Sequence, residues 1–309
     1  MSISDFIYIH PEVQSALTDG RAVVALESTV ITHGLPYPDN VKTAVSMQTA
    51  VREGGAIPAT IAILKGIVHV GLTDDELEAL GQMDGSTVRK CSRRDIPIAI
   101  ARGEYGATTV AGTMILANEV GIPVFATGGI GGVHRGHPFD VSADLTELGR
   151  TPVAVVSSGA KSILDLPATR EVLETNGIPV IGYGTDEMPA FFSLTSGLPV
   201  DVRVDNPDEA AAIIRIHHEL LLQNGMLFTV PVPFADAFDP DDAEEAIVQA
   251  TREAEEQGIH GKESTPWLLS RVVELTDGRS MRANMALLQN NGRVAGQIAL
   301  ALTKNLMGY

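Results

Sequence analysis

The sequence predicts an α/β fold, a three-layer α/β/α sandwich with a mostly parallel central sheet. Short apolar runs recur along the chain, for example Val23–Leu26, Val153–Val156 and Ile178–Ile181. Amphipathic segments typical of helices separate these runs. Continuous apolar strands with intervening helices indicate a parallel sheet covered on both faces. Because the chain has no repeat and no long linker, we expect residues 1–309 to form a single domain, although a break near Val200 stays open.

The first half of the chain supplies most of the expected strands. The elements expected there are a strand at Val23–Leu26, a helix at Asn40–Val51, apolar runs at Ile57–Leu64 and Ile67–Leu72, a helix beginning at Thr73, a strand at Ile96–Ala101, a helix at Thr108–Val120 and a strand at Ile122–Ala126. The helix at Asn40–Val51 follows from apolar residues that recur on one side. Thr73 predicts a helix start because three acids follow it in the first turn.

The second half is expected to be more helical. A helix around Ala168–Glu174 separates two strands, and a further strand is expected at Leu227–Val230. Asn206, Asp239 and Thr265 each stand directly before a proline. A capping residue followed by proline is typical of a helix start, since the first helical N–H has no intrahelical acceptor to lose.

The composition excludes several classes of protein. Lys plus Arg number 22 and Asp plus Glu number 39, so the formal net charge is −17. This acidity argues against binding to a nucleic-acid polymer or an anionic membrane surface. With 44% hydrophobic residues the chain is not expected to be disordered. A single cysteine, no apolar run near the roughly 18 residues of a membrane helix and no evident signal peptide favour a cytoplasmic location.

Glu27 is a candidate general acid. It directly follows the apolar run Val23–Leu26, and ligands collect at the carboxyl ends of parallel strands. A half-buried glutamate has its protonated form favoured, which suits proton donation. A structural role, capping a helix or meeting an arginine, is equally compatible with this position.

Residues 127–136 form a glycine-rich candidate loop. Five glycines within nine residues would let the backbone approach a ligand and point N–H groups at an anion, with His134 and Arg135 as further donors. The spacing does not match a dinucleotide fingerprint, and a flexible surface loop is the alternative. Asp140 and Asp144 follow, with the oxygen ligands that hard divalent cations prefer, although two such acids are also common at a helix start.

Lys161 is a candidate nucleophile because it follows the apolar run Val153–Val156 among small residues. Desolvation there would leave a neutral amine that attacks carbonyl carbons, and an ordinary surface lysine is the alternative. Arg89–Arg94 holds four of the 22 basic residues, which suggests a small phosphate pocket combined with structural salt bridges. His33 and His137 stay unassigned. Cys91 and the apolar residues around Trp267 are expected to be core packing: Leu268, Leu269, Val272, Val273 and Leu275.

Taken together, these segments resemble the pseudouridine-5′-phosphate glycosidases, a family that includes indigoidine-synthase-A-like proteins. The matching segments run in order from about Ala25 to Ala299: ALESTVITHGLPYP, VRKCSRRDIP, GATTVAGTM, FATGGIGGVHRG, DVSADLTELGRTPVAVVSSGAKSILD, ETNGIPVIGYGTDEMPAFF and SMRANMALLQNNGRVAGQIA. The resemblance therefore covers nearly the whole chain.

The resemblance implies reversible cleavage of pseudouridine 5′-phosphate into uracil and ribose 5-phosphate. It also implies a single α/β/α catalytic domain, a homotrimer and a divalent metal, usually Mn²⁺. Glu27 would be the proton donor, Lys161 the nucleophile and Asp140 the metal ligand, mostly through waters. The residues implied to contact substrate are Lys90, Val110, Thr127, His134, Ser142, Ala143, Asp144 and, for the base, Asn284.

The residue types suit this chemistry. A C–C glycosidic bond has no heteroatom leaving group, so the general acid of the usual two-carboxylate mechanism has no leaving-group atom to protonate. Ring opening assisted by Glu27 and imine formation at Lys161 would provide another route. Two alternatives stay open at this point: a different Schiff-base sugar-phosphate lyase or aldolase, and a non-catalytic sugar-phosphate binding protein.

Overall fold

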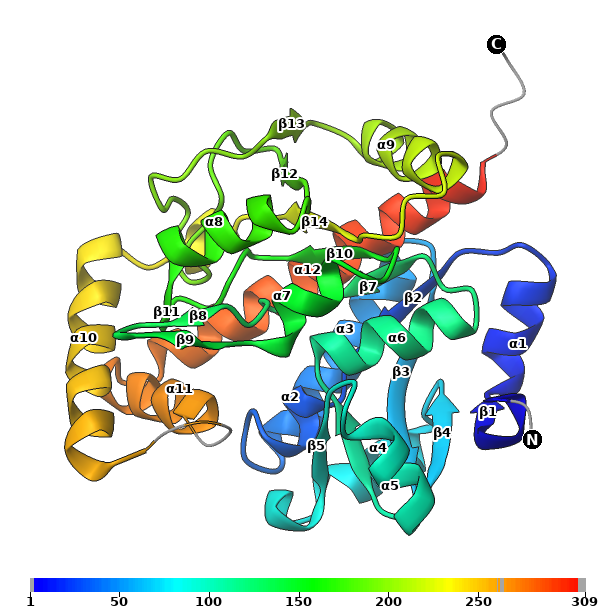
Figure 1. The fold of residues 1–309 in the computed structure, drawn as a ribbon, viewed down its shortest axis with the longest axis horizontal. Helices are drawn as coiled ribbons and strands as arrows, with labels where there is room; N and C mark the ends of the chain where they lie inside the picture. The colour runs from blue at the N-terminus through cyan, green and yellow to red at the C-terminus, as the bar shows by residue number, and fades with distance from the viewer. Residues whose placement is uncertain (1–2, 260, 262–263, 305–309) are drawn as a thin grey trace.

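The computed structural model describes residues 3–259, 261 and 264–304. It confirms the predicted α/β class (Figure 1). The main sheet runs in the order β1-β4-β3-β2-β7-β10-β14-β12-β13, and the pair β5 and β6 joins it through β3. Most neighbouring pairs are parallel, while β3 is antiparallel to β4 and β6. A small antiparallel sheet, β11-β8-β9, lies beside it.

The strands of the described residues are short, apart from β3. Their bounds are β1 Ile7–Ile9, β2 Val23–Leu26, β3 Ile57–Leu64, β4 Ile67–Val70, β5 Arg89–Cys91, β6 Gly106–Thr108, β7 Val124–Ala126, β8 Val133–His134, β9 His137–Val141, β10 Ala154–Ser157, β11 Leu164–Asp165, β12 Val180–Tyr183, β13 Val202–Val204 and β14 Met226–Thr229.

Helices cover the sheet and form one end of the molecule (Figure 1). Their bounds are α1 Pro11–Thr18, α2 Thr29–Thr32, α3 Asp39–Glu53, α4 Asp74–Gly81, α5 Ile96–Arg102, α6 Val110–Glu119, α7 Ala143–Leu148, α8 Leu166–Thr175, α9 Pro207–Glu219, α10 Pro240–Gln257, α11 Ser264–Leu275 and α12 Arg279–Thr303, with short 3₁₀ turns at Ile3–Phe6, Gly85–Thr87 and Phe234–Asp236. None of these helices is long and apolar enough to cross a membrane.

The sheet order places a topological switch point between β2 and β7. From β2 the chain passes to β3 on one side, whereas β7 and then β10 extend the sheet on the other side. The loops that leave β2 and β7 diverge at such a point, and the crevice between them is where open α/β sheets bind ligands. The residues after β2, β7 and β10 therefore meet at one edge of the sheet.

Helix α12 lies behind the centre of the sheet and packs closely on α3 (Figure 1). It contacts β2, β7 and β10 as well. The approach to α3 depends on glycine, because a Cβ on Gly296 would lie 2.6 Å from the carbonyl oxygen of Val51. A Cβ on Gly54 would likewise lie 2.4 Å from the carbonyl oxygen of Arg293. The last helix is thus seated directly beneath the strand ends that carry the candidate site.

Most of the predicted helix starts are confirmed. Thr73 and Glu76 form a reciprocal capping box at α4, and the side chains of Asn206 and Asp239 cap α9 and α10. Thr265 is not a cap, because α11 already includes Ser264. Pro266 then falls in the first turn, where backbone N–H groups have no intrahelical acceptor and a missing donor costs little.

The strand predicted at Ile96–Ala101 is wrong, since these residues form helix α5. Ile96 and Ala99 are buried while Ile98 is 41% exposed, which is a helical spacing of buried positions. Pro97 lies in the first turn, where helices accept it. A short apolar run cannot be assigned to strand or helix by periodicity alone. The helix predicted from Thr108 begins instead at Val110, after Thr109 as its cap.

Candidate active site

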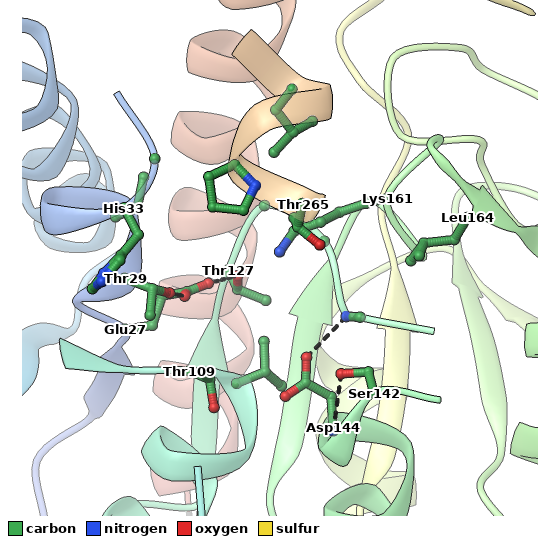
Figure 2. Close-up of a pocket in the computed structure, with 18 of the residues that line it drawn as sticks. Glu27, Thr29, His33, Thr109, Thr127, Ser142, Asp144, Lys161, Leu164 and Thr265 are labelled. Atoms are coloured by element: carbon green, nitrogen blue, oxygen red, sulfur yellow. Dashed lines mark hydrogen bonds between the residues drawn. The ribbon is translucent and has the colours of Figure 1, made fainter. Parts of the chain in front are cut away.

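One cavity of about 430 Å³ opens at the carboxyl edge of the sheet (Figure 2). Its size is within the range of small-molecule sites. Every residue to which the family resemblance gives a role lines it, namely Glu27, Lys90, Val110, Thr127, His134, Asp140, Ser142, Ala143, Asp144, Lys161 and Asn284. The fold therefore brings together residues that lie as far apart as 27 and 284 in the sequence. Arg135, the further donor proposed from the glycine-rich segment, does not line it and pairs with Glu244 instead.

Glu27 is half-buried at the end of β2, and both of its carboxylate oxygens accept hydrogen bonds. The hydroxyl of Thr29 donates to Oε2 and that of Thr127 donates to Oε1 (Figure 2). The second bond crosses the switch point from β2 to β7. These two partners of Glu27 are hydroxyls, neither an arginine nor a backbone N–H of a helix N-terminus. Because a hydroxyl can donate or accept, this clamp suits either protonation state of the carboxyl group.

The glycine loop after β7 is hydrogen-bonded to the loop after β10 along its length. The N–H of Ser158 donates to the carbonyl of Gly128 at 2.8 Å, and that of Ile130 donates to Gly159 at 3.0 Å. The N–H of Lys161 then donates to the carbonyl of Ile130 at 3.1 Å. The alternative of a flexible surface loop is therefore wrong for residues 128–130. Their backbone also fixes the backbone of Lys161, the candidate nucleophile.

Close packing explains two of the loop glycines. A Cβ on Gly129 would lie 2.8 Å from the ring of Phe191, and one on Gly131 would lie 2.2 Å from Oγ of Ser142. The side chain of Lys161, which starts on the opposite loop, extends into the cavity (Figure 2).

Asp144 is buried and ties three elements together. Its Oδ1 accepts from the N–H of Ala111 in α6, and its Oδ2 accepts from the N–H of Gly131, each at 2.9 Å. Ser142 caps the same helix α7 by accepting from the N–H of Asp144. Since both oxygens of Asp144 are engaged by backbone donors, this carboxylate shapes the cavity wall and is poorly placed to be a metal ligand.

Asp140 lies on the exposed strand β9 and faces the same cavity. Among residues 3–259, 261 and 264–304 there is no group of three or more His, Cys, Asp or Glu side chains that could form a closed metal site. A single carboxylate at a solvent-open edge does fit a hard cation that keeps most of its waters. The donor set therefore accommodates a hydrated divalent ion.

The basic residues of the segment Arg89–Arg94 have two different roles. Arg89 and Arg93 are structural, because Arg89 pairs with Glu104 and Arg93 with the buried Glu147, each with an N–O distance of 2.5 Å. Lys90 and Arg94 line the cavity instead. A mixture of pocket cations and structural salt bridges was predicted for this segment. For Arg89 and Lys90 the alternation along β5 explains it, since neighbouring residues of a strand point to opposite faces.

Two histidines in the cavity favour the neutral form. Burial, with a smaller contribution from the charge of Lys90, lowers the pKa of His33. Burial also lowers the pKa of His134, which the Asp140 carboxylate partly opposes. His33 was left unassigned by the sequence, and the only signal for it was its place six residues after Glu27 in the same strand-end segment.

Helices α11 and α12 form the wall opposite the strand ends. Leu268 and Val272 are buried as predicted. Leu269 and Val273, also expected in the core, line the cavity instead, because they lie on the face of α11 turned toward the sheet. Asn284 comes from α12, so this wall combines apolar surface with one amide.

The chain matches a family of known proteins along almost its entire length. The matching family is described as indigoidine synthase A like protein, and the match covers residues 12–301. The chain belongs to this family. This confirms the resemblance found in the sequence.

Two relatives are similar to this chain over almost their whole length. A pseudouridine-5′-phosphate glycosidase from Solibacter usitatus is 55% identical over 95% of this chain and 98% of its own length. One of the same name from Clostridium botulinum is 53% identical over 98% of this chain and 99% of its own length.

Two solved structures have the same fold. The prealnumycin C-glycosynthase AlnA, in complex with ribulose 5-phosphate, is 41% identical with a TM-score of 0.88, covering 96% of this chain and 97% of that one. An indigoidine synthase A-like protein from Thermotoga maritima is 40% identical with a TM-score of 0.88, covering 97% of both chains.

Proposed function

We propose that this chain is a pseudouridine-5′-phosphate glycosidase that cleaves the C–C glycosidic bond to give uracil and ribose 5-phosphate, reversibly. Curated relatives with that name are 50–55% identical over most of this chain. The observation in the structure that carries the proposal is a hydroxyl-clamped Glu27 and a loop-held Lys161 lining one cavity with cationic side chains. A carboxyl group, an amine and an anion subsite are what this reaction needs.

The reaction begins with opening of the ribose ring. Glu27 donates a proton to the ring oxygen while the amine of Lys161 adds to the anomeric carbon, so that the C–O bond breaks as the N–C bond forms. The lysine nitrogen then forms an imine and expels uracil, whose ring carbon keeps the electron pair and takes up a proton. Water hydrolyses the imine and releases ribose 5-phosphate and the free lysine.

The substrate phosphate is proposed to lie near Lys90, Val110 at the start of α6, and the segment Ser142–Asp144. These groups line the cavity, and a cationic side chain favours an anion. His134, held neutral by burial, can donate one hydrogen bond there. Asn284 on α12 is proposed to bind the base. Phosphate binding supplies positioning energy remote from the reacting carbon.

The divalent metal, expected to be Mn²⁺, stays a prediction, with Asp140 as its protein ligand. Such an ion supplies positive charge near polar substrate groups and orders water. A direct check is titration of Mn²⁺ followed by its electron paramagnetic resonance signal. Wild type should bind the ion, and Asp140→Asn should bind it more weakly, whatever the activity of either protein. The homotrimer and the cytoplasmic location are likewise predictions.

The deciding experiment is incubation of the purified chain with pseudouridine 5′-phosphate and a manganese salt. We expect free uracil on chromatography and ribose 5-phosphate in equal amount. Absence of uracil would rule the proposal out.

Borohydride reduction separates the two alternatives. A sugar-phosphate binding protein would gain no covalent ribose phosphate, whereas the glycosidase should gain one at Lys161 by mass spectrometry. Another Schiff-base lyase would give the adduct but no uracil.

A further inference from the structure

Asn291 is a fully buried amide on α12, directly beneath the two loops that carry the site. It lines no part of the cavity, and the mechanism above does not use it. A buried amide needs its hydrogen bonds satisfied, since an unpaired polar group in the interior is costly. Asn291 therefore requires hydrogen-bond partners within the interior.

Its amide group bridges both loops. Nδ2 lies 2.8 Å from the carbonyl oxygen of Thr127 and 3.3 Å from that of Gly128, to which it donates. Nδ2 also lies 3.2 Å from Oγ of Ser158, and that hydroxyl is 3.3 Å from Oδ1 of Asn291. One side chain thus joins the loop after β7 to the loop after β10.

Each loop in turn holds one reacting group. The hydroxyl of Thr127 donates to the Glu27 carboxylate, and Ser158 begins the turn whose backbone leads to Lys161. Both loop residues are buried, so no water competes for their polar groups. Asn291 is thus linked to Glu27 through Thr127, and to Lys161 through Ser158 and the turn that follows it.

We infer that Asn291 is a positioning residue that sets the spacing between the acid Glu27 and the nucleophile Lys161. The inference rests on the proposed function. An amide can serve this purpose where an apolar side chain cannot, because its N–H groups reach backbone carbonyls of one loop while its oxygen faces the hydroxyl of the other. Misplacement of reacting groups by about 1 Å costs on the order of 100-fold in rate.

The test is Asn291→Leu, which keeps nearly the same size but loses all four contacts. We expect kcat for uracil release to fall by about 100-fold, because Glu27 and Lys161 would no longer be held at the correct spacing. KM should change less than about threefold. Asn290→Leu is the matched control, because Asn290 is the neighbouring residue on α12 and donates to the carbonyl of Pro231 instead. It should leave kcat unchanged.

Ser158→Ala is a milder variant that keeps the contacts of Asn291 to the β7 loop. It should lower kcat by about tenfold, and it decides the question if Asn291→Leu fails to fold. In the double variant the losses in kcat should be less than additive, since both changes break one link. Fully additive losses, or a kcat of Asn291→Leu equal to that of Asn290→Leu, would overturn the inference.

A readout without substrate keeps the inference separate from the proposed function. An amine-reactive reagent should label Lys161 at a different rate in Asn291→Leu than in wild type, while the exposed Lys65 reacts at the same rate in both. Unchanged labelling of Lys161 would count against the positioning role even if wild type released no uracil. Wild type without uracil release but with altered labelling in the variant would overturn only the proposed function.

Discussion

The floor and the rim of the cavity are held together in different ways. The floor consists of Glu27 and the loops 127–131 and 157–161, which are joined by buried hydrogen bonds between backbone groups and by Asn291. The rim consists of α11, which lines the cavity, together with α10, which packs on α11 at one end of the molecule (Figure 1). Ion pairs near solvent link the rim, such as Arg271 with Glu253 at 2.5 Å.

This difference separates the groups that position the reacting atoms from the groups that only stabilise the fold. Buried, fully paired groups fix positions to within a fraction of an ångström, which chemistry requires. Ion pairs near solvent contribute little stability and tolerate movement. Changes in the floor should therefore act on kcat, and changes in the rim on stability alone.

The largest effect is expected for Lys161→Ala in the floor. Removal of a nucleophile leaves no route to the imine, so kcat should fall by at least about 10⁴-fold. The circular dichroism spectrum and the midpoint of thermal unfolding should stay close to those of wild type, since the side chain projects into the cavity. Normal turnover in this variant would refute the nucleophile.

Glu27→Gln should have the next largest effect. Glutamine keeps the size, and it can accept from one of the hydroxyls of Thr29 and Thr127 and donate to the other, but it has no acidic proton to give. We expect kcat to fall by about 10²- to 10⁴-fold with KM little changed. Steady-state kinetics of uracil release measure both, and an unchanged kcat would contradict the acid role.

Between floor and rim, the basic cluster offers a matched pair. Lys90→Met removes a cation that lines the cavity, so KM for the nucleoside monophosphate should rise by about 10- to 100-fold, as expected for a charged hydrogen bond. Arg89→Met removes the partner of Glu104 and should lower thermal stability without raising KM. A KM increase in Arg89→Met as large as in Lys90→Met would show that the two neighbours do not divide as described.

In the rim, Glu253→Gln should lower the free energy of unfolding only slightly, because its ion pair with Arg271 lies near solvent. Its partner Arg271 keeps a second acid, Glu274, which compensates in part. The more exposed Glu274→Gln should cost still less. Urea unfolding measures both. A loss of kcat above about threefold in Glu253→Gln, whose side chain does not line the cavity, would break the distinction between floor and rim.

The smallest effect concerns pH. Burial lowers the pKa of His33 in the folded chain below the ordinary value of 6.5. Between these two values the unfolded chain binds more protons, so stability falls as pH drops below 6.5 and levels off below the folded pKa. His33→Gln should lose less unfolding free energy than wild type between pH 8 and pH 5. An equal loss in the two proteins would refute this contribution.

The sequence predicts which residues lie at the carboxyl ends of the strands better than it predicts the hydrogen bonds that their side chains form. Glu27 stands directly after an apolar run and Lys161 five residues after another, and a parallel sheet brings such positions together without further information. The clamp of Thr29 and Thr127 on Glu27 could not be predicted, because the contact depends on the order of β2 and β7 in the sheet. Asn291 was equally hidden, since a lone amide in a helix carries no signal of what it faces.

The errors have a similar cause. Ile96–Ala101 was assigned to a strand because a six-residue apolar run lacks a distinguishing period, and only the packing of Ile96 and Ala99 decides for a helix. Leu269 and Val273 were assigned to the core because the spacing of apolar residues shows one side of a helix but not whether a core or a cavity lies there.

The seat of α12 beneath the strand ends has a consequence for the order of folding. Thr127 and its partner Asn291 are separated by 164 residues, and Glu27 and Thr127 by 100. Contacts of such long range form late, and chains emerge from the ribosome from the N-terminus. During synthesis the sheet can be largely assembled before the Asn291 amide is available to donate to the carbonyls of Thr127 and Gly128. Catalytic competence should therefore arrive in one step, when the last helix docks.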